Sequence, residues 1–151
     1  MGFTNCQIIF QLFLSIILGG LIGLEREYRR KEAGLRTFSL VCLGSTLFTL
    51  ILRLGFEDLI GRPGIAFDPS RIIQAVAMGI GFIGAGLIIY REFHIEGLTT
   101  AAGLWVVAAV GVAIGLRFYF PAIFTTFLTV LIFTGFRFFE EKILGSKSFE
   151  K

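Results

Sequence analysis

Few side chains in this sequence could bind a metal or carry acid–base chemistry, and they are widely separated. Glu25, Asp68 and Glu96 each lie beside a long apolar segment. Because Mg²⁺ keeps several waters and needs only one or two carboxylates, these three acids are candidate ligands at the mouth of a pore. The single histidine, His94, lies on a short polar stretch with Glu92 and Glu96, and we expect it to be solvated.

No motif for an enzyme accompanies these acids in the sequence. Metal-ligand spacings, nucleophile motifs and phosphate loops are lacking. Residues 79–84 match the pattern GxGxxG, but a dinucleotide site also needs a preceding strand and an acid about 20 positions later. Residues 97–116 contain no acid. We therefore predict a non-enzymatic protein without a cofactor.

The placement of charge indicates which elements hold these residues. The chain of 151 residues is 55% apolar and 17% charged, against about 25% charged for a soluble domain. Segments 1–24, 37–52, 72–90, 97–116 and 118–136 contain no charged residue. Each approaches the length of about 20 residues that crosses a membrane core. The sequence predicts an all-α integral membrane protein with five transmembrane helices.

The positions of Lys and Arg predict how the helices are oriented. Ten of the 14 basic residues fall in segments 25–36, 91–96 and 137–151. The positive-inside rule then puts the N-terminus outside and the C-terminus in the cytoplasm. Residues 1–136 are predicted to form the transmembrane domain and 137–151 a short cytoplasmic tail. The first segment is expected to be retained, because no cleavage site for a signal peptide precedes Glu25.

Two charged segments border the predicted helices. Asp68, followed by proline, is typical of a helix start, so we expect it to cap the third helix, with Arg71 near enough to pair with it. The segment 25–36 has two interpretations. It is either a solvated turn facing lipid headgroups, or a fold in which Glu25, Arg26 and Arg36 form a polar cluster under the helices.

Small residues four positions apart predict helix packing, because they let two backbones approach closely. This spacing favours a packed centre made of the first, third and fourth spans, with a phenylalanine-rich fifth span facing lipid. The glycines expected to make the contacts are Gly19, Gly23, Gly81, Gly111 and Gly115.

Net charge and cysteine content exclude two further interpretations. The net charge of +3 follows the membrane-orientation rule and comes with no nucleic-acid motif. Cys6 and Cys42 fall near opposite membrane faces, so a disulfide between them within one chain is implausible. Both are expected to be buried free thiols.

Five motifs in a fixed order resemble the MgtC/SapB family of bacterial inner-membrane proteins. They are GLERE at 23–27, AGLRT at 33–37, DPSRI at 68–72, GIGFIGAG at 79–86 and EGLTTAAGLW at 96–105. The resemblance covers about residues 8–116. It implies the five-span hydrophobic domain in the same orientation, a link to magnesium limitation and, in pathogens, survival inside host cells.

The resemblance also implies positions and a type of function. Members were long suspected of moving magnesium, yet they look more like regulators of other membrane proteins and of membrane energetics. We expect such a regulator, with the bilayer and other membrane proteins as partners. An oligomeric magnesium or ion channel is the alternative, a partner-binding scaffold is a third, and homo-oligomer formation stays open. Longer members continue into a soluble cytoplasmic domain, whereas only residues 137–151 follow here. The family-motif positions are Glu25, Arg26, Arg36, Asp68, Arg71, Gly84, Thr99, Thr100 and Trp105.

Overall fold

The computed structural model describes residues 5–56, 68, 70–91 and 94–136. Within these ranges lie five helices that are long and apolar enough to cross a membrane, as predicted. The predicted tail 137–151 and Glu92 lie outside the described residues. The elements are α1 (Asn5–Tyr28), α2 (Leu35–Gly55), α3 (Ser70–Leu87), β1 (Ile89–Arg91), β2 (His94–Glu96), α4 (Leu98–Gly115), α5 (Tyr119–Leu131) and the π-helical turn η2 (Ile132–Phe136), which continues α5.

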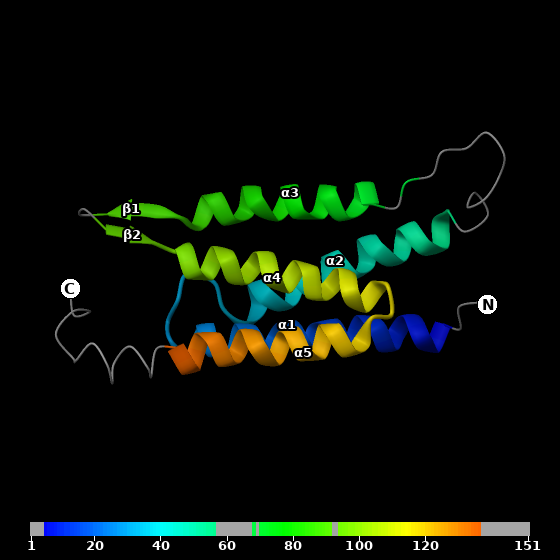
Figure 1. The fold of residues 1–151 in the computed structure, drawn as a ribbon, viewed down its shortest axis with the longest axis horizontal. Helices are drawn as coiled ribbons and strands as arrows, with labels where there is room; N and C mark the ends of the chain where they lie inside the picture. Colours follow the sequence, from blue (N-terminus) through cyan, green and yellow to red (C-terminus); the bar gives the residue numbers. More distant parts are fainter. Residues whose placement is uncertain (1–4, 57–67, 69, 92–93, 137–151) are drawn as a thin grey trace.

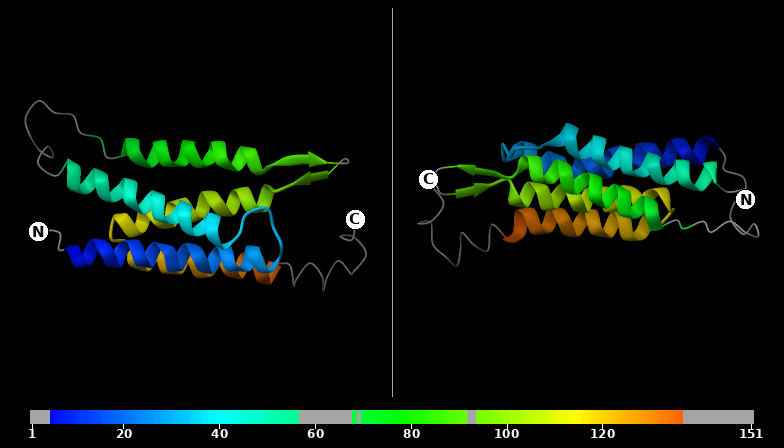
Figure 2. Two further views of the ribbon diagram at one scale, coloured as in Figure 1. Left: turned by 180° about the vertical axis from the view of Figure 1, so that it is seen from behind. Right: turned by 90° about the horizontal axis from the view of Figure 1, so that it is seen from above.

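The helices run along one common axis, and β1 and β2 project beyond one end of the bundle (Figure 1). We call this the hairpin end. There α1, α3 and η2 end and α2 and α4 begin (Figure 1). The central helix is α4, which contacts α1, α2, α3 and α5 (Figure 2). It is also the helix whose spanning window is most buried, at 56%.

The prediction that the first, third and fourth spans form the centre of the bundle is wrong. The spanning window of α3 is only 11% buried, and α3 packs mainly on α4. Its place in the centre is taken by α2, which packs on both α1 and α4. Gly81 has no neighbouring atom within 4 Å of an added Cβ, so its predicted packing contact is missing within this chain. Small-residue spacing marks a helix face but does not say which helix covers it.

Glycines of α1 and α4 lie directly against the backbone of α2. A Cβ added at Gly19 would lie 2.7 Å from the Cβ of Cys42, and one at Gly115 would lie 2.5 Å from the Cβ of Thr49. A Cβ at Gly111 would overlap the carbonyl oxygen of Cys42. The hydroxyl of Thr46 donates to the carbonyl of Gly111 at 2.9 Å. Close packing and hydrogen bonds therefore hold α2 and α4 together, as is usual between membrane helices.

The first helix continues past the predicted boundary at Leu24, so Glu25 and Arg26 are helical rather than part of a loop. No glycine or proline interrupts this stretch, and the spacing of Glu25 and Arg29 favours helix. The helix ends where Arg30 adopts a left-handed φ of 54°. The amide of Lys31 then donates to the carbonyl of Arg26 at 3.0 Å, as in a Schellman motif. Arginine thus occupies a position that usually holds glycine.

The predicted helix 72–90 ends early, at Leu87, and a short β-hairpin follows it in the otherwise helical chain. Residues Ile89–Arg91 pair antiparallel with His94–Glu96, with Ile89 opposite Glu96. Gly97 adopts a φ of 84° and redirects the chain into α4, where a Cβ would overlap the carbonyl oxygen of Leu87. The β-hairpin therefore joins α3 to α4 as the short antiparallel connection that the loop length predicted.

Two smaller predictions have different outcomes. The carboxylate of Asp68 accepts a hydrogen bond from the amide of Ser70 at 2.9 Å, which confirms the predicted helix cap. Both cysteines are free, but only Cys42 is buried, so the expectation of burial is wrong for Cys6. On α5, Phe120, Phe124 and Phe127 are exposed, in keeping with a peripheral helix.

Candidate functional site

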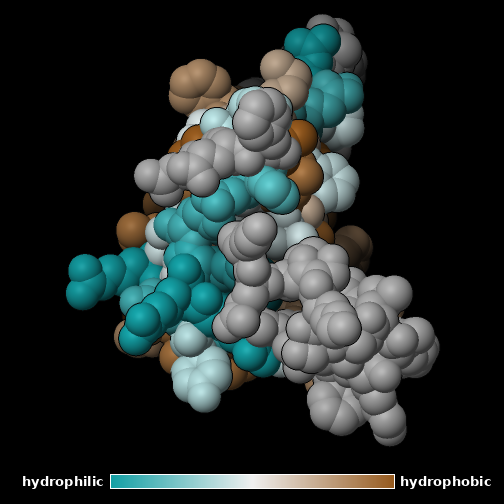
Figure 3. Space-filling model, turned by 90° about the vertical axis from the view of Figure 1, so that its left-hand side faces the viewer, coloured by the Kyte–Doolittle hydropathy of each residue, from teal (hydrophilic) through white to brown (hydrophobic). Residues whose placement is uncertain are grey.

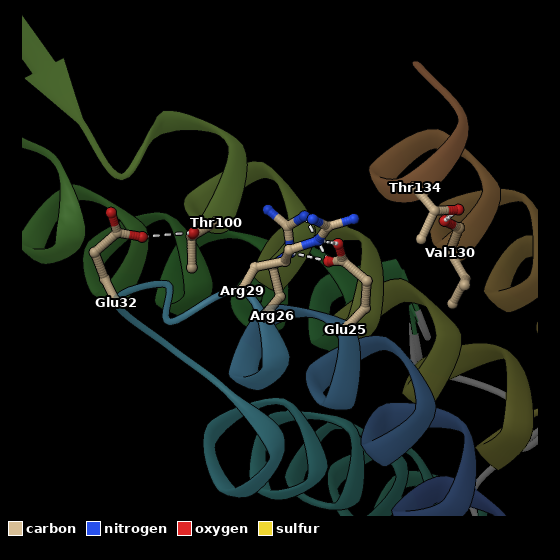
Figure 4. A network of polar contacts seen from close by, with 7 residues as sticks. All are labelled: Glu25, Arg26, Arg29, Glu32, Thr100, Val130 and Thr134. Carbon is tan, nitrogen blue, oxygen red and sulfur yellow. Dashed lines mark hydrogen bonds and ion pairs between the residues drawn. The ribbon is translucent and has the colours of Figure 1, made fainter. Parts of the chain in front are cut away.

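Polar residues of three chain segments meet at the hairpin end (Figure 4). One group comes from the last turn of α1, a second from the connection between α1 and α2, and a third from the first turn of α4. The aromatic side chain of Phe133 joins them from η2. We call Glu25, Arg26, Arg29, Glu32, Thr100 and Phe133 the hairpin-end cluster.

The cluster is built around a nearly buried ion pair. Nη2 and Nε of Arg26 each lie 2.5 Å from Oε2 of Glu25. Nε of Arg29 lies 3.5 Å from the other carboxylate oxygen. The side chains of Glu25 and Arg26 are only 9% and 6% exposed. A carboxylate flanked by two guanidinium groups is electrostatically compensated, so Glu25 is poorly placed to bind a further cation.

An aromatic ring covers one face of the Arg26 guanidinium. Cζ of Arg26 lies 3.7 Å from the ring centroid of Phe133, which is within the range of a cation–π interaction. The same ring packs against Gly103, where an added Cβ would lie 2.7 Å from its Cζ. Phe133 falls in the span predicted to face lipid, and Gly103 is not among the glycines predicted to pack. Only their partners in the fold identify these residues, although a π-helical turn often marks a functional site.

A second polar contact links the α1–α2 connection to α4. The buried hydroxyl of Thr100 donates to the carboxylate of Glu32 at 2.7 Å. Burial raises the pKa of Glu32, but the hydrogen bond from Thr100 and the nearby charges of Lys31 and Arg26 outweigh it, so the pKa lies below 4.5. An ionised carboxylate at the first turn of α4 is also favoured by the helix dipole.

A third acid, Glu27 in the last turn of α1, caps the start of α2. The amide of Leu35 donates to the carboxylate of Glu27 at 2.9 Å. Gly34, the residue before α2, supplies no side-chain cap, so Glu27 satisfies one of the free amides of that helix. All three acids between residues 25 and 36 therefore make internal contacts.

Polar side chains also converge at the other end of α4. The amide of Gln11 donates to the carbonyls of Ile114 and Gly115, and Arg53 donates to the carbonyl of Gly115 at 3.1 Å. Arg117 donates to the side chain of Gln7 at 2.8 Å. Gln11, which is completely buried, is not among the residues predicted from the sequence. These contacts satisfy the carbonyls that a helix C-terminus leaves free.

The structure separates the three candidate metal ligands. Glu25 lies in the cluster, Glu96 is exposed on β2, and Asp68 caps α3 at the opposite end of the bundle (Figure 1). Among the described residues no group of three potential ligands forms. Hydrogen bonds from the hydroxyl and amide of Ser70 lower the pKa of Asp68. These observations assign Asp68 to helix capping.

The other family-motif positions fall into two groups. Thr100 joins the cluster, and Gly84 packs against Ala101, 3.5 Å from the position of an added Cβ. The remaining positions are exposed. The observed cluster therefore lacks Arg36, which was predicted to join Glu25 and Arg26, and contains Arg29 instead. The exposed positions are Arg36, Arg71, Thr99 and Trp105.

Five apolar helices with polar clusters at both ends of the central helix define a multi-pass membrane protein. The family model "MgtC family" matches residues 12–142, which is most of the chain. The protein therefore belongs to the MgtC family, as the motifs indicated.

Curated relatives show the same membership. The "Putative magnesium transporter YhiD" of Escherichia coli K12 is 45% identical over 132 residues, covering 87% of this chain and 61% of YhiD. "Protein SrpB" of Synechococcus elongatus is 39% identical over 136 residues, with 85% and 74% covered. "Protein MgtC" of Brucella abortus is 44% identical over 101 residues, with 67% and 39% covered. No solved structure matches the chain.

Proposed function

We propose that this protein is a non-enzymatic regulator in the bacterial inner membrane. It acts on magnesium or other ion homeostasis, or on membrane energetics, through contacts with other membrane proteins. The observation that carries the proposal is the close packing of α2 on α4. Gly111 and Gly115 leave no room for even one further carbon between these helices.

The packing bears on transport because α4 is the centre of the bundle. A hydrated ion passing along α4 within one chain would have to separate it from α2, breaking the contact of Thr46 with Gly111. An apolar groove of about 590 Å³ instead lies between α2 and α3, lined by residues such as Val41, Phe48 and Val76. An apolar groove suits lipid or a helix better than an ion.

The proposed orientation places the hairpin end in the cytoplasm. It rests on the excess of Lys and Arg in the segments 25–36, 91–96 and 137–151. The hairpin-end cluster would then lie on the cytoplasmic side of the membrane. Partner proteins would contact either this cluster or the exposed faces of α3.

An oligomeric magnesium transporter is the second candidate. YhiD, the relative named a putative magnesium transporter, shares 45% identity, although this chain covers only 61% of its length. The exposed glycines Gly79, Gly81 and Gly86 of α3 have open space beside them and would allow close contact between copies. A pore would then form between chains, with Asp68 or Glu96 at its mouths.

Reconstitution into liposomes loaded with a magnesium dye separates the two candidates. A regulator acting on partners should give no uptake above empty liposomes, and Glu25→Gln and Asp68→Asn should not change this result. Cys6→Ser, an exposed change in the first turn of α1 at the end where Asp68 lies, is the control. Uptake that is lost in Glu25→Gln or Asp68→Asn but kept in Cys6→Ser would overturn the proposal in favour of transport.

The partner contact itself can be tested on α3. Gly81→Leu should leave membrane insertion intact but reduce capture of the partner, because Gly81 has open space beside it. Ala109→Leu, on an exposed position of α4, is the matched control. If the two variants capture partners as well as the native chain does, α3 is not the contact surface.

A further inference from the structure

We infer that the hairpin end carries a binding site for one anionic phospholipid. The geometry points to two adjoining parts: an apolar groove between α1 and α2 that takes an acyl chain, and a cationic surface at its mouth that takes the phosphate headgroup. The inference is independent of the proposed regulatory function.

The groove lies on the outer surface of the α1–α2 pair and has a volume of about 310 Å³. Its walls end at Leu24 and Leu35, the two residues that flank the charged connection. From Ile16 to Leu24 the helix rises roughly 12 Å, close to the depth of one leaflet of a core of about 30 Å. The lining residues are Ile16, Ile17, Gly20, Leu21, Leu24, Leu35 and Ser39.

The segment 25–36 at the mouth of the groove carries a net positive charge, because it holds five bases and three acids. Glu25 is paired with Arg26 and Arg29, Glu32 accepts from Thr100, and Glu27 accepts from the start of α2. The exposed bases here are Arg30 and Lys31 of the α1–α2 connection and Arg36 in the first turn of α2, and among the described residues none of them is in an ion pair. Figure 3, which looks onto this end, shows hydrophilic residues gathered across the face.

Arg30 provides a separate observation. It adopts the left-handed conformation that ends α1, a position where glycine avoids a steric penalty. Arg117 ends α4 in the same way, but its side chain donates to Gln7 inside the bundle. The side chain of Arg30 is exposed. A strained residue kept at a surface position is a reason to look for a ligand, and a phosphate diester suits a guanidinium.

Tyr28 completes the site. It is 82% exposed and follows Leu21 and Leu24 along the same side of α1. Tyrosine is enriched at the level of lipid headgroups, where its ring is apolar and its hydroxyl is polar. Glu27 follows Leu24 in the last turn of α1, and its carboxylate accepts a hydrogen bond from the amide of Leu35.

Lipid retention measured by native mass spectrometry tests the site. The full chain, purified in a neutral detergent, is mixed with phosphatidylglycerol or phosphatidylcholine, which differ in headgroup charge but share acyl chains. We expect one phosphatidylglycerol to bind preferentially. Arg30→Gln with Arg36→Gln should weaken it by about five-fold for each charge removed. Arg71→Gln, at the opposite end, should leave binding within two-fold.

Two further arms separate a lipid from its headgroup. Lysophosphatidylglycerol, with one acyl chain, should compete, whereas millimolar inorganic phosphate or glycerol 3-phosphate should not. Leu21→Trp, which fills the groove without changing charge, should also weaken binding, whereas Phe13→Trp on the exposed face of α1 should not. Equal binding of the two lipids, equal loss in Arg71→Gln, or competition by free phosphate would overturn the inference.

Discussion

The guanidinium of Arg26 lies 3.7 Å from the ring centroid of Phe133 and 2.5 Å from the carboxylate of Glu25. Arg26 belongs to α1 and Phe133 to η2, so their contact joins the first helix to the last described turn at the hairpin end. An almost buried arginine is thus satisfied by a carboxylate on one side and an aromatic face on the other.

Removing one member of this contact should destabilise the bundle. Arg26→Met leaves the Glu25 carboxylate buried with only Arg29 near it, and we expect a loss of about 3 kcal/mol in unfolding free energy. Phe133→Leu keeps apolar volume and should cost about 1 kcal/mol. The double variant should lose less than the sum of the single variants, because both remove the same contact. Additive losses in detergent unfolding curves would show that the ring does not stabilise the cation.

The glycines of α4 and α3 should respond in opposite ways to alanine. Gly111→Ala would push a methyl group into the Cys42 carbonyl, and we expect more than about 2 kcal/mol of destabilisation. Gly81→Ala meets no neighbour and should be neutral or raise stability by up to about 1 kcal/mol. Thermal unfolding in one detergent measures both. A strong loss for Gly81→Ala would mean that α3 packs on something in solution, such as a second copy.

Arg30→Gly should raise stability. Glycine adopts the left-handed conformation at the end of α1 without the penalty that arginine has, so we expect a gain of about 1 kcal/mol. The measurement is chemical unfolding in detergent without added lipid, where a lost lipid contact cannot mask the gain. Arg29→Gly, one residue earlier and directly after α1, should instead destabilise, because it removes the contact with Glu25.

The contact between Glu32 and Thr100 should stabilise the protein in a pH-dependent way. The folded pKa of Glu32 lies below the ordinary value of 4.5, so the contribution is complete above about pH 4.5. It is lost as the pH falls through the folded pKa. We therefore expect Thr100→Val to lower the free energy of unfolding by about 1 kcal/mol near pH 7. This is less than the value for a fully buried hydrogen bond to a charged group, because Glu32 is exposed. The difference from the native chain should shrink below pH 4.5, and a difference independent of pH would rule out this origin.

Replacements of Asp68 should follow its role as a helix cap. Asp68→Ala should lower the unfolding temperature, whereas Asp68→Asn should largely keep it, since asparagine caps helices equally well. Because Ser70 lowers the pKa of Asp68, the difference between the aspartate and asparagine forms should appear only as the pH falls below 3.8. If magnesium raises the unfolding temperature of the native chain but not that of Asp68→Asn, then Asp68 binds the cation.

The sequence alone was sufficient for the number and type of spanning helices. Charge-free segments of about 20 residues have few alternatives in a bilayer, where every backbone group must be satisfied within a helix. The cap at Asp68 was equally predictable, because it is formed by residues adjacent in the chain. The family membership followed from the order of the motifs and is shown by the match over residues 12–142.

Tertiary structure alone decided which faces meet. The spacing of Gly19 and Gly111 marked small faces of α1 and α4. Only the fold shows that both faces pack against α2 and that α3 lies at the edge of the bundle. Likewise the composition of segment 25–36 allowed either a solvated turn or a cluster. Contacts with Thr100 and Phe133, far along the chain, hold Glu32 and Arg26 in place, whereas Arg30, Lys31 and Arg36 stay exposed. Local composition determines helices, whereas the pairing of faces depends on complementary shape between segments distant in sequence.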